Sequence, residues 1–175
     1  MEYIILDLEA TCWEGDRTKR NEIIEIGAVK VIDGKIADEF QRFIKPKLNP
    51  ILSDFCKQLT SIKQEDVDNA QNFTEVIEGF QKWIGNDYYL CSWGFYDKNQ
   101  FASDCELHKL PTGWLRNHIS LKHQHGDMKR LKKGLGLGRA LREEGMKFEG
   151  TAHRGIDDAK NIAKIFIKYI NDWKY

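Results

Sequence analysis

Two carboxylates interrupt an apolar stretch near the start of the chain. Asp7 and Glu9 lie within ILDLEATCW, and alternate positions of a strand share a face, so both side chains project together, about 7 Å apart along the strand. Two ionised carboxylates this close repel each other and lose hydration on burial unless a cation lies between them. The pair therefore indicates either a metal site or a strand that ends near Leu6 and leaves both acids in solvent.

Two further segments carry residues of related chemistry. HRGIDD places His153 five residues before Asp158 where a C-terminal helix starts, and CSWGFYDKNQF places Asp97 where a short strand passes into a helix. Each has an ordinary structural explanation, because acids stabilise a helix's first turn, Gln100 completes a capping box with Asp97, and lone histidines are more often structural. All of them nevertheless lie at the starts and ends of elements, where side chains can converge in the folded chain.

The elements that must position these residues follow from hydrophobic period and turn signals. The runs at 23–32 and 35–44 meet at Asp33-Gly34, a strong hairpin signal, so they should pair antiparallel. Other strands are expected at 2–9, in YYLCSW and at 118–122. Helices are expected in LTSIKQEDVDNA with Ser61 and Gln64 as a capping box, at 73–84, at 97–108, as two short pieces in DMKRLKKGLGLGRALREEG, and at about 156–173. Strands mixed with helices predict a layered α/β domain over residues 1–175.

The charge and cysteine content narrow the functional class. Lys plus Arg and Asp plus Glu number 27 each, so the net charge gives no case for nonspecific binding to nucleic acid or membranes. No apolar run approaches the roughly 20 residues of a membrane helix, and no signal-peptide pattern opens the sequence. The four cysteines include no CxxC pair, so we expect free thiols and a cytoplasmic protein.

Together the acidic and histidine motifs resemble the DEDDh family of 3′-to-5′ exonucleases. DLEATCW, NEIIEIGAV, LTSIKQEDVDNA, SWGFYD and HRGIDDAKNIA follow one another over nearly the whole chain, and they are similar to the branch that trims small-RNA, histone-mRNA and ribosomal-RNA 3′ ends. The resemblance implies an RNase H-like fold, with a mixed central sheet (strands 1–3 antiparallel, later strands parallel) flanked by helices. One departure is Ser61, where related proteins read L-T-G-I, and its Cβ is expected to narrow the space beside the terminal nucleotide.

The resemblance also implies a mechanism with two divalent cations, Mg²⁺ or Mn²⁺, which prefer carboxylate oxygens. Asp7 would bridge the two ions, Glu9 and Asp158 would hold the first, and Asp97 would assist through water. His153 would be the general base that takes a proton from the attacking water, because an imidazole can accept a proton near neutral pH. The products would be nucleoside 5′-monophosphates released from single-stranded 3′ ends, with RNA favoured over DNA.

The resemblance also implies contacts to the substrate. By resemblance, the segment that approaches the terminal ribose is Ala10, Thr11, Cys12 and Trp13. Leu59 and Ile62 would wedge against the last base. Aromatic candidates for base stacking are Trp13, Trp93, Phe95 and Tyr96, with core packing the favoured alternative for Trp93 and Phe95. Basic residues that either track phosphates or form a solvated helix face are Lys129, Arg130, Lys132, Lys133, Arg139 and Arg142.

Two rival functions use the same fold. One is a catalytically silent RNA-binding module, which has no need to crowd carboxylates near phosphates. The other is an exonuclease acting mainly on DNA, since no sequence pattern reveals a contact to the 2′-OH. Two weaker patterns are set aside, namely a zinc site with unsuitable spacing at His118, His123, His125 and Cys105, and a glycine-rich phosphate loop that follows no convincing strand at Gly134, Gly136 and Gly138.

Overall fold

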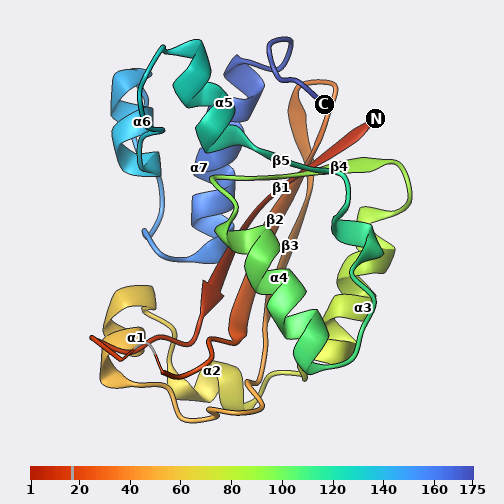
Figure 1. The fold of residues 1–175 in the computed structure, drawn as a ribbon, viewed down its shortest axis with the longest axis vertical. Helices are drawn as coiled ribbons and strands as arrows, with labels where there is room; N and C mark the ends of the chain where they lie inside the picture. The colour runs from red at the N-terminus through yellow and green to blue at the C-terminus, as the bar shows by residue number, and fades with distance from the viewer. Residues whose placement is uncertain (17) are drawn as a thin grey trace.

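A five-stranded mixed sheet forms the centre of the computed structural model, which describes residues 1–16 and 18–175. The strand order is β3-β2-β1-β4-β5 (Figure 1). The strands are β1 (Glu2–Ala10), β2 (Ile23–Ile32), β3 (Lys35–Phe43), β4 (Tyr88–Ser92) and β5 (His118–Ser120). The first three pair antiparallel, and β4 and β5 continue the sheet parallel to β1, which confirms the predicted fold class.

The β2–β3 hairpin forms at the predicted turn. Asp33 and Gly34 have φ values of 50° and 74°, the conformation that a two-residue hairpin turn requires. Ile32 is therefore paired with Lys35.

Helices cover both faces of the sheet (Figure 1). Their bounds are α1 (Asp54–Thr60), α2 (Gln64–Asp68), α3 (Phe73–Ile84), α4 (Tyr96–Leu107), α5 (Leu121–Met128), α6 (Leu137–Glu143) and α7 (Gly155–Lys168), with a 3₁₀ turn at Gly113–Leu115. Even positions of β1, such as Leu6, face a core shared with α3 and α4, whereas Ile5 faces a core shared with α7. The alternation therefore points Asp7 and Glu9 toward α7. Every helix in the described ranges is too short or too polar to cross a membrane.

Several local predictions were wrong. Helix α1 was not predicted, and Ser61 ends it in the left-handed conformation (φ 59°) instead of capping the next helix, α2, which begins at Gln64. Helix α4 is preceded by Phe95 at the N-cap, so Asp97 lies inside its first turn. Helix α7 stops at Lys168, and Trp173 folds back with its indole N–H donating to the Phe166 carbonyl at 2.9 Å.

Candidate active site

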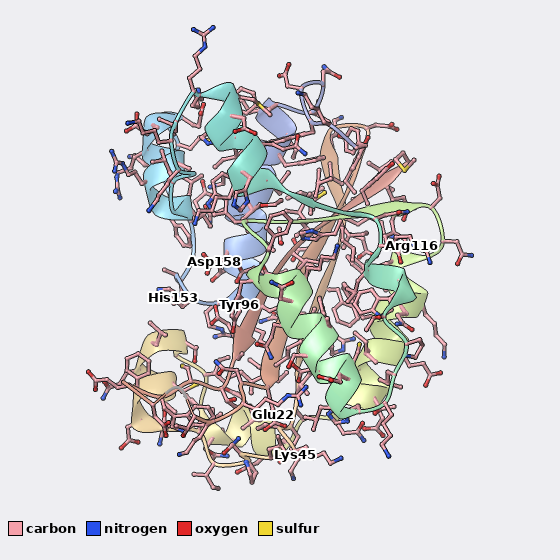
Figure 2. All side chains as sticks on the ribbon, viewed as in Figure 1. Glu22, Lys45, Tyr96, Arg116, His153 and Asp158 are labelled. Carbon is pink, nitrogen blue, oxygen red and sulfur yellow. The ribbon has the colours of Figure 1, made fainter. Side chains whose placement is uncertain are left out.

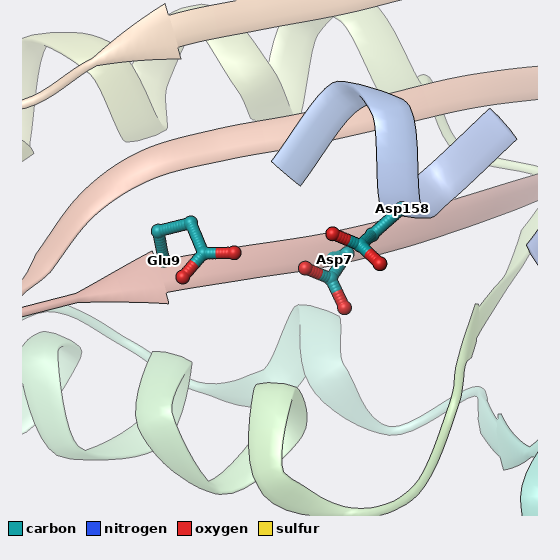
Figure 3. A group of neighbouring side chains, drawn as sticks. All are labelled: Asp7, Glu9 and Asp158. Carbon is teal, nitrogen blue, oxygen red and sulfur yellow. The ribbon is translucent and has the colours of Figure 1, made fainter. Parts of the chain in front are cut away.

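Three of the predicted acids meet at one end of the sheet. Oxygens of Asp7, Glu9 and Asp158 all lie within 4.8 Å of one another, and no other group of three metal-ligating side chains is found in the described residues. Figure 3 shows the Asp7 and Asp158 carboxylates turned toward each other, with Glu9 further along β1. The structure thus joins acids separated by about 150 positions of sequence into one site.

Two glycines allow α7 to reach this position. Gly27 of β2 is paired with Asp7, and a Cβ at Gly27 would lie 2.0 Å from both the carbonyl carbon of Gly155 and the nitrogen of Ile156. A Cβ at Gly155 would in turn lie 2.9 Å from the main-chain oxygen of Asp7. The first turn of α7 therefore rests directly on the backbones of β1 and β2, which brings Asp158 beside Asp7.

Glu25, an acid that was not predicted to belong to the site, lies next to the group of three. Glu25 of β2 is fully buried and pairs with Glu9 across the two strands. Its carboxylate accepts hydrogen bonds from the Gly155 N–H at 3.1 Å, from Arg154 Nε at 3.2 Å and from Gln41 Nε2 at 2.7 Å. The available signal was an acid inside the apolar run IIEIGAV, two residues before Gly27 and therefore on the same face of β2.

The electrostatics of the site fit a divalent cation. Burial, followed by the charges of Asp158 and Glu25, raises the pKa of Glu9 to about 8. Burial also raises the pKa of Asp7 well above its usual range, with Asp97 and Asp158 adding to the effect. Oδ2 of Asp158 is buried without a hydrogen-bond partner. Crowded carboxylates with an unpartnered oxygen are the hard donor set that Mg²⁺ and Mn²⁺ bind.

Asp97 lies beside the three acids and has a separate hydrogen bond. Pairing between β1 and β4 ends at Ile5 and Cys91, so Leu8 lies beyond the last paired residue, and its N–H donates to Asp97 Oδ1 at 3.1 Å. Burial raises the pKa of Asp97 to about 6, although the bond from Leu8 opposes the shift. Asp97 is not a member of the group formed by the other three acids, whose oxygens lie within 4.8 Å of one another.

His153 lies on the turn that leads into α7. Its backbone is left-handed (φ 60°) and its side chain is exposed. Burial raises the pKa of Asp158, while the backbone N–H and the side chain of His153 oppose that shift, so the histidine lies close to this acid. Figure 2 shows His153, Asp158 and Tyr96 gathered on one side of the molecule.

The predicted ribose segment differs in exposure along its length. Ala10 and Thr11 are buried, and the Thr11 hydroxyl accepts the Glu22 N–H at 2.9 Å. Cys12 and Trp13 are half-buried and continue the segment toward solvent. Side chains of the first two residues are therefore occupied by the fold, and the surface of the segment is formed by the last two.

The predicted base contacts are also divided. Leu59 is 39% exposed, whereas Ile62 is fully buried beneath α1 and α2, so in this structure only Leu59 offers side-chain surface to a base. Trp93 packs in the core beside α7, as the favoured alternative predicted. Phe95 does not: it is 48% exposed and stacks on His123, because it precedes α4 at the sheet's end. Tyr96 is 53% exposed.

One predicted phosphate contact has a structural role. Lys129 pairs at 2.8 Å with Glu144, a buried carboxylate that also accepts from His125 at 2.8 Å and from Lys168 at 2.6 Å. The remaining basic residues of this stretch are exposed: Arg130, Lys132, Lys133, Arg139 and Arg142.

Comparison with known proteins agrees with this geometry. A family model described as Exonuclease matches residues 4–166. The 3′-5′ exoribonuclease 1 of Mus musculus is 34% identical over 98% of this chain and 54% of its own length, so the chain spans about half of that relative. The solved nuclease domain of 3′hExo, described as a DEDDh family member bound to rAMP, has a TM-score of 0.91 and 32% identity, covering 98% of this chain and 92% of that one.

A second solved structure, described as the 3′-end-specific recognition of the histone mRNA stem-loop by 3′-exonuclease, has a TM-score of 0.90 and 32% identity, covering 98% of this chain and 82% of that one. The family match, over residues 4–166, covers most of the chain. The chain therefore belongs to the exonuclease family and, within it, to the DEDDh group.

Proposed function

We propose that the chain is a divalent-metal-dependent 3′-to-5′ exonuclease that acts on single-stranded 3′ ends, with RNA preferred, and releases nucleoside 5′-monophosphates. One observation carries this proposal: Asp7, Glu9 and Asp158 converge within 4.8 Å while one oxygen of Asp158 stays buried without a partner. A protein that only binds RNA gains nothing from anionic oxygens gathered where phosphates would approach, because they repel each other.

The acids would bind the cations in different ways. Asp7, with Asp158 and Glu9, would hold two ions, Mg²⁺ or Mn²⁺, and Asp97 would assist from beside them. When bound, such ions supply positive charge that stabilises the attacking and leaving oxygens of an in-line displacement at phosphorus. The hydrogen bond from Leu8 fixes the orientation of Asp97, and the packing of α7 on Gly27 fixes that of Asp158.

His153 would act as the general base. Its exposed imidazole lies on the rim of the acidic site, on the turn that leads into the helix carrying Asp158, where it can take a proton from the attacking water. The exposed side chains of Leu59 and Tyr96, with the surface of Trp13, would contact the terminal nucleotide. A stacked base contributes about 1–3 kcal/mol to binding at such an aromatic surface.

The preference for RNA rests on relatives. The Mus musculus relative is named an exoribonuclease, and one solved relative is described as recognising the 3′ end of a histone mRNA stem-loop. Both names concern those proteins, and this chain spans 54% of the length of the first.

The test compares RNA and DNA oligonucleotides of identical sequence, 5′-labelled, with Mn²⁺ or with EDTA. We expect a ladder that shortens from the 3′ end, free nucleoside 5′-monophosphates, faster cleavage of RNA, and no cleavage in EDTA. The His153→Ala variant should retain the fold and Mn²⁺ binding yet lose about 10²–10⁴-fold in rate.

Each other outcome points to a rival. Binding of RNA without nucleotide release under any metal condition would replace the enzyme with a silent binding module. Faster cleavage of DNA would make DNA the substrate class. Wild-type turnover by His153→Ala would overturn the assignment of the general base.

A further inference from the structure

Glu25 connects the sheet to the turn that carries His153. The N-cap residue of α7, Arg154, provides no side-chain hydrogen bond to the helix. The first N–H groups of a helix need acceptors from outside the helix. The Gly155 N–H finds its acceptor on another strand, in the buried carboxylate of Glu25 at 3.1 Å.

The same carboxylate also holds Arg154. Glu25 Oε2 accepts from Arg154 Nε at 3.2 Å, and the guanidinium lies 5.3 Å from the centre of the Phe43 ring, on the strand position paired with Glu25. Gln41 donates to Oε1 at 2.7 Å and so fixes the carboxylate itself. Two successive residues after His153 are thus anchored to β2 and β3.

We infer that Glu25 is a positioning residue: it fixes the turn at residues 153–155 on the sheet and thereby orients His153 and Asp158 over Asp7. The inference rests on the function proposed above. The positioning role depends on the length of the glutamate side chain, since the acceptor oxygen must extend from β2 to the amide of Gly155. The negative charge of Glu25 pairs with Arg154 and disfavours ionisation of the neighbouring Glu9, whereas the bond to Gly155 depends only on an acceptor oxygen at this reach.

Two substitutions separate reach from charge. Glu25→Gln keeps the length and one acceptor oxygen, and Gln41 can rotate its amide to match, so the bond to Gly155 survives. Glu25→Asp keeps the charge but withdraws the carboxylate by one methylene. Glu22→Asp is the matched control, because Glu22 is another buried acid that accepts backbone N–H groups, those of Lys47, Leu48 and Asn49, far from α7. Figure 2 shows Glu22 well separated from His153 and Asp158.

The first measurement is amide hydrogen exchange at Gly155 in EDTA, which needs neither metal nor turnover. We expect Glu25→Asp to exchange about tenfold faster at Gly155, with Glu25→Gln and Glu22→Asp close to wild type. The second is steady-state cleavage of an RNA oligonucleotide. Glu25→Asp should lose about tenfold or more in kcat with little change in KM, because a misoriented base loses rate rather than binding.

A double variant tests whether the effect passes through His153. In the His153→Ala background, adding Glu25→Asp should reduce kcat by a smaller factor than it does in the wild type, because one of the two groups being positioned is gone. Wild-type exchange at Gly155 and wild-type kcat in Glu25→Asp would overturn the inference. Equal losses of kcat in Glu25→Gln and Glu25→Asp would also overturn it, and so would a wild-type kcat in Glu25→Asp with a reduced kcat in Glu25→Gln. If the wild-type protein releases no nucleotide, the proposed function fails, whereas exchange at Gly155 still reports whether Glu25 holds the turn.

Discussion

A methyl group added at Gly27 should move α7, which carries Asp158, away from β1, which carries Asp7 and Glu9. In Gly27→Ala the new Cβ would lie 2.0 Å from two backbone atoms, the carbonyl carbon of Gly155 and the nitrogen of Ile156. Ordinary contact begins at 3.4 Å, so the first turn of α7 must retreat by about 1.4 Å. Neither atom belongs to a side chain that can rotate away, and the helix must move as a unit.

The cost should exceed that of ordinary overpacking. Extra methylenes in a packed core typically cost about 1–3 kcal/mol, and a collision with helix backbone belongs at or above the upper end, about 3 kcal/mol. The same retreat would carry Asp158 away from Asp7 and enlarge the 4.8 Å group of oxygens. We therefore expect the affinity for Mn²⁺ to fall by at least about tenfold, which corresponds to ~1.4 kcal/mol.

The assay pairs urea denaturation with Mn²⁺ titration calorimetry. Gly79→Ala is the matched control, because Gly79 lies exposed within α3 and a Cβ there meets nothing within 4 Å. Replacing a glycine inside a helix with alanine should raise the free energy of unfolding by about 0.5–1 kcal/mol and leave Mn²⁺ binding unchanged. A Gly27→Ala protein as stable as wild type and with the same Mn²⁺ affinity would refute the close-packing account of the site.

Three further predictions concern charge and backbone strain. Asp7→Asn should abolish activity more completely than loss of the general base, yet raise the melting temperature in EDTA, because one of the crowded charges is removed. In EDTA the contribution of Asp97 and Glu9 to stability should be greatest below about pH 4, where both carboxyls are protonated in the folded and unfolded states. That contribution should be lost as pH rises through about 6 and 8, because burial raises the pKa values of Asp97 and Glu9 to these values in the folded protein. Mn²⁺ should therefore raise the melting temperature most at the alkaline end. Ser61→Gly should raise the free energy of unfolding by about 1 kcal/mol in urea denaturation, since Ser61 adopts φ 59°, and unchanged KM would show that its Cβ does not restrict the nucleotide.

The features that sequence predicted are those encoded over a few residues. Alternation along β1 gives the common face of Asp7 and Glu9, and Asp33-Gly34 gives the hairpin, because each pattern acts within one or two elements. The convergence of Asp158 with these acids came from resemblance to a family. Spacing alone left Asp158 as an ordinary first-turn acid of a helix.

The features that sequence did not predict depend on what lies across the sheet. Glu25 is one more acid in an apolar run until α7 is placed on it, and Gly27 carries no signal until Gly155 is found against it. The N-cap interpretation of Asp97 failed for a related reason, since the side chain is taken by Leu8 of a strand 89 residues away. Long-range partners decide these roles, and no local pattern names the partner.

The unpartnered oxygen of Asp158 is tolerable because α7 is held elsewhere. Beyond its first turn the helix buries Ile162, Ala163 and Phe166 against the sheet. Burial of a large apolar side chain such as that of Ile162 or Phe166 stabilises a fold by about 1.5–3 kcal/mol. That contribution is of the same order as the cost of a buried polar atom without a partner, about 1–3 kcal/mol. The apolar part of α7 can therefore keep the acidic turn in place before any cation binds, so the site should be largely formed in the metal-free protein.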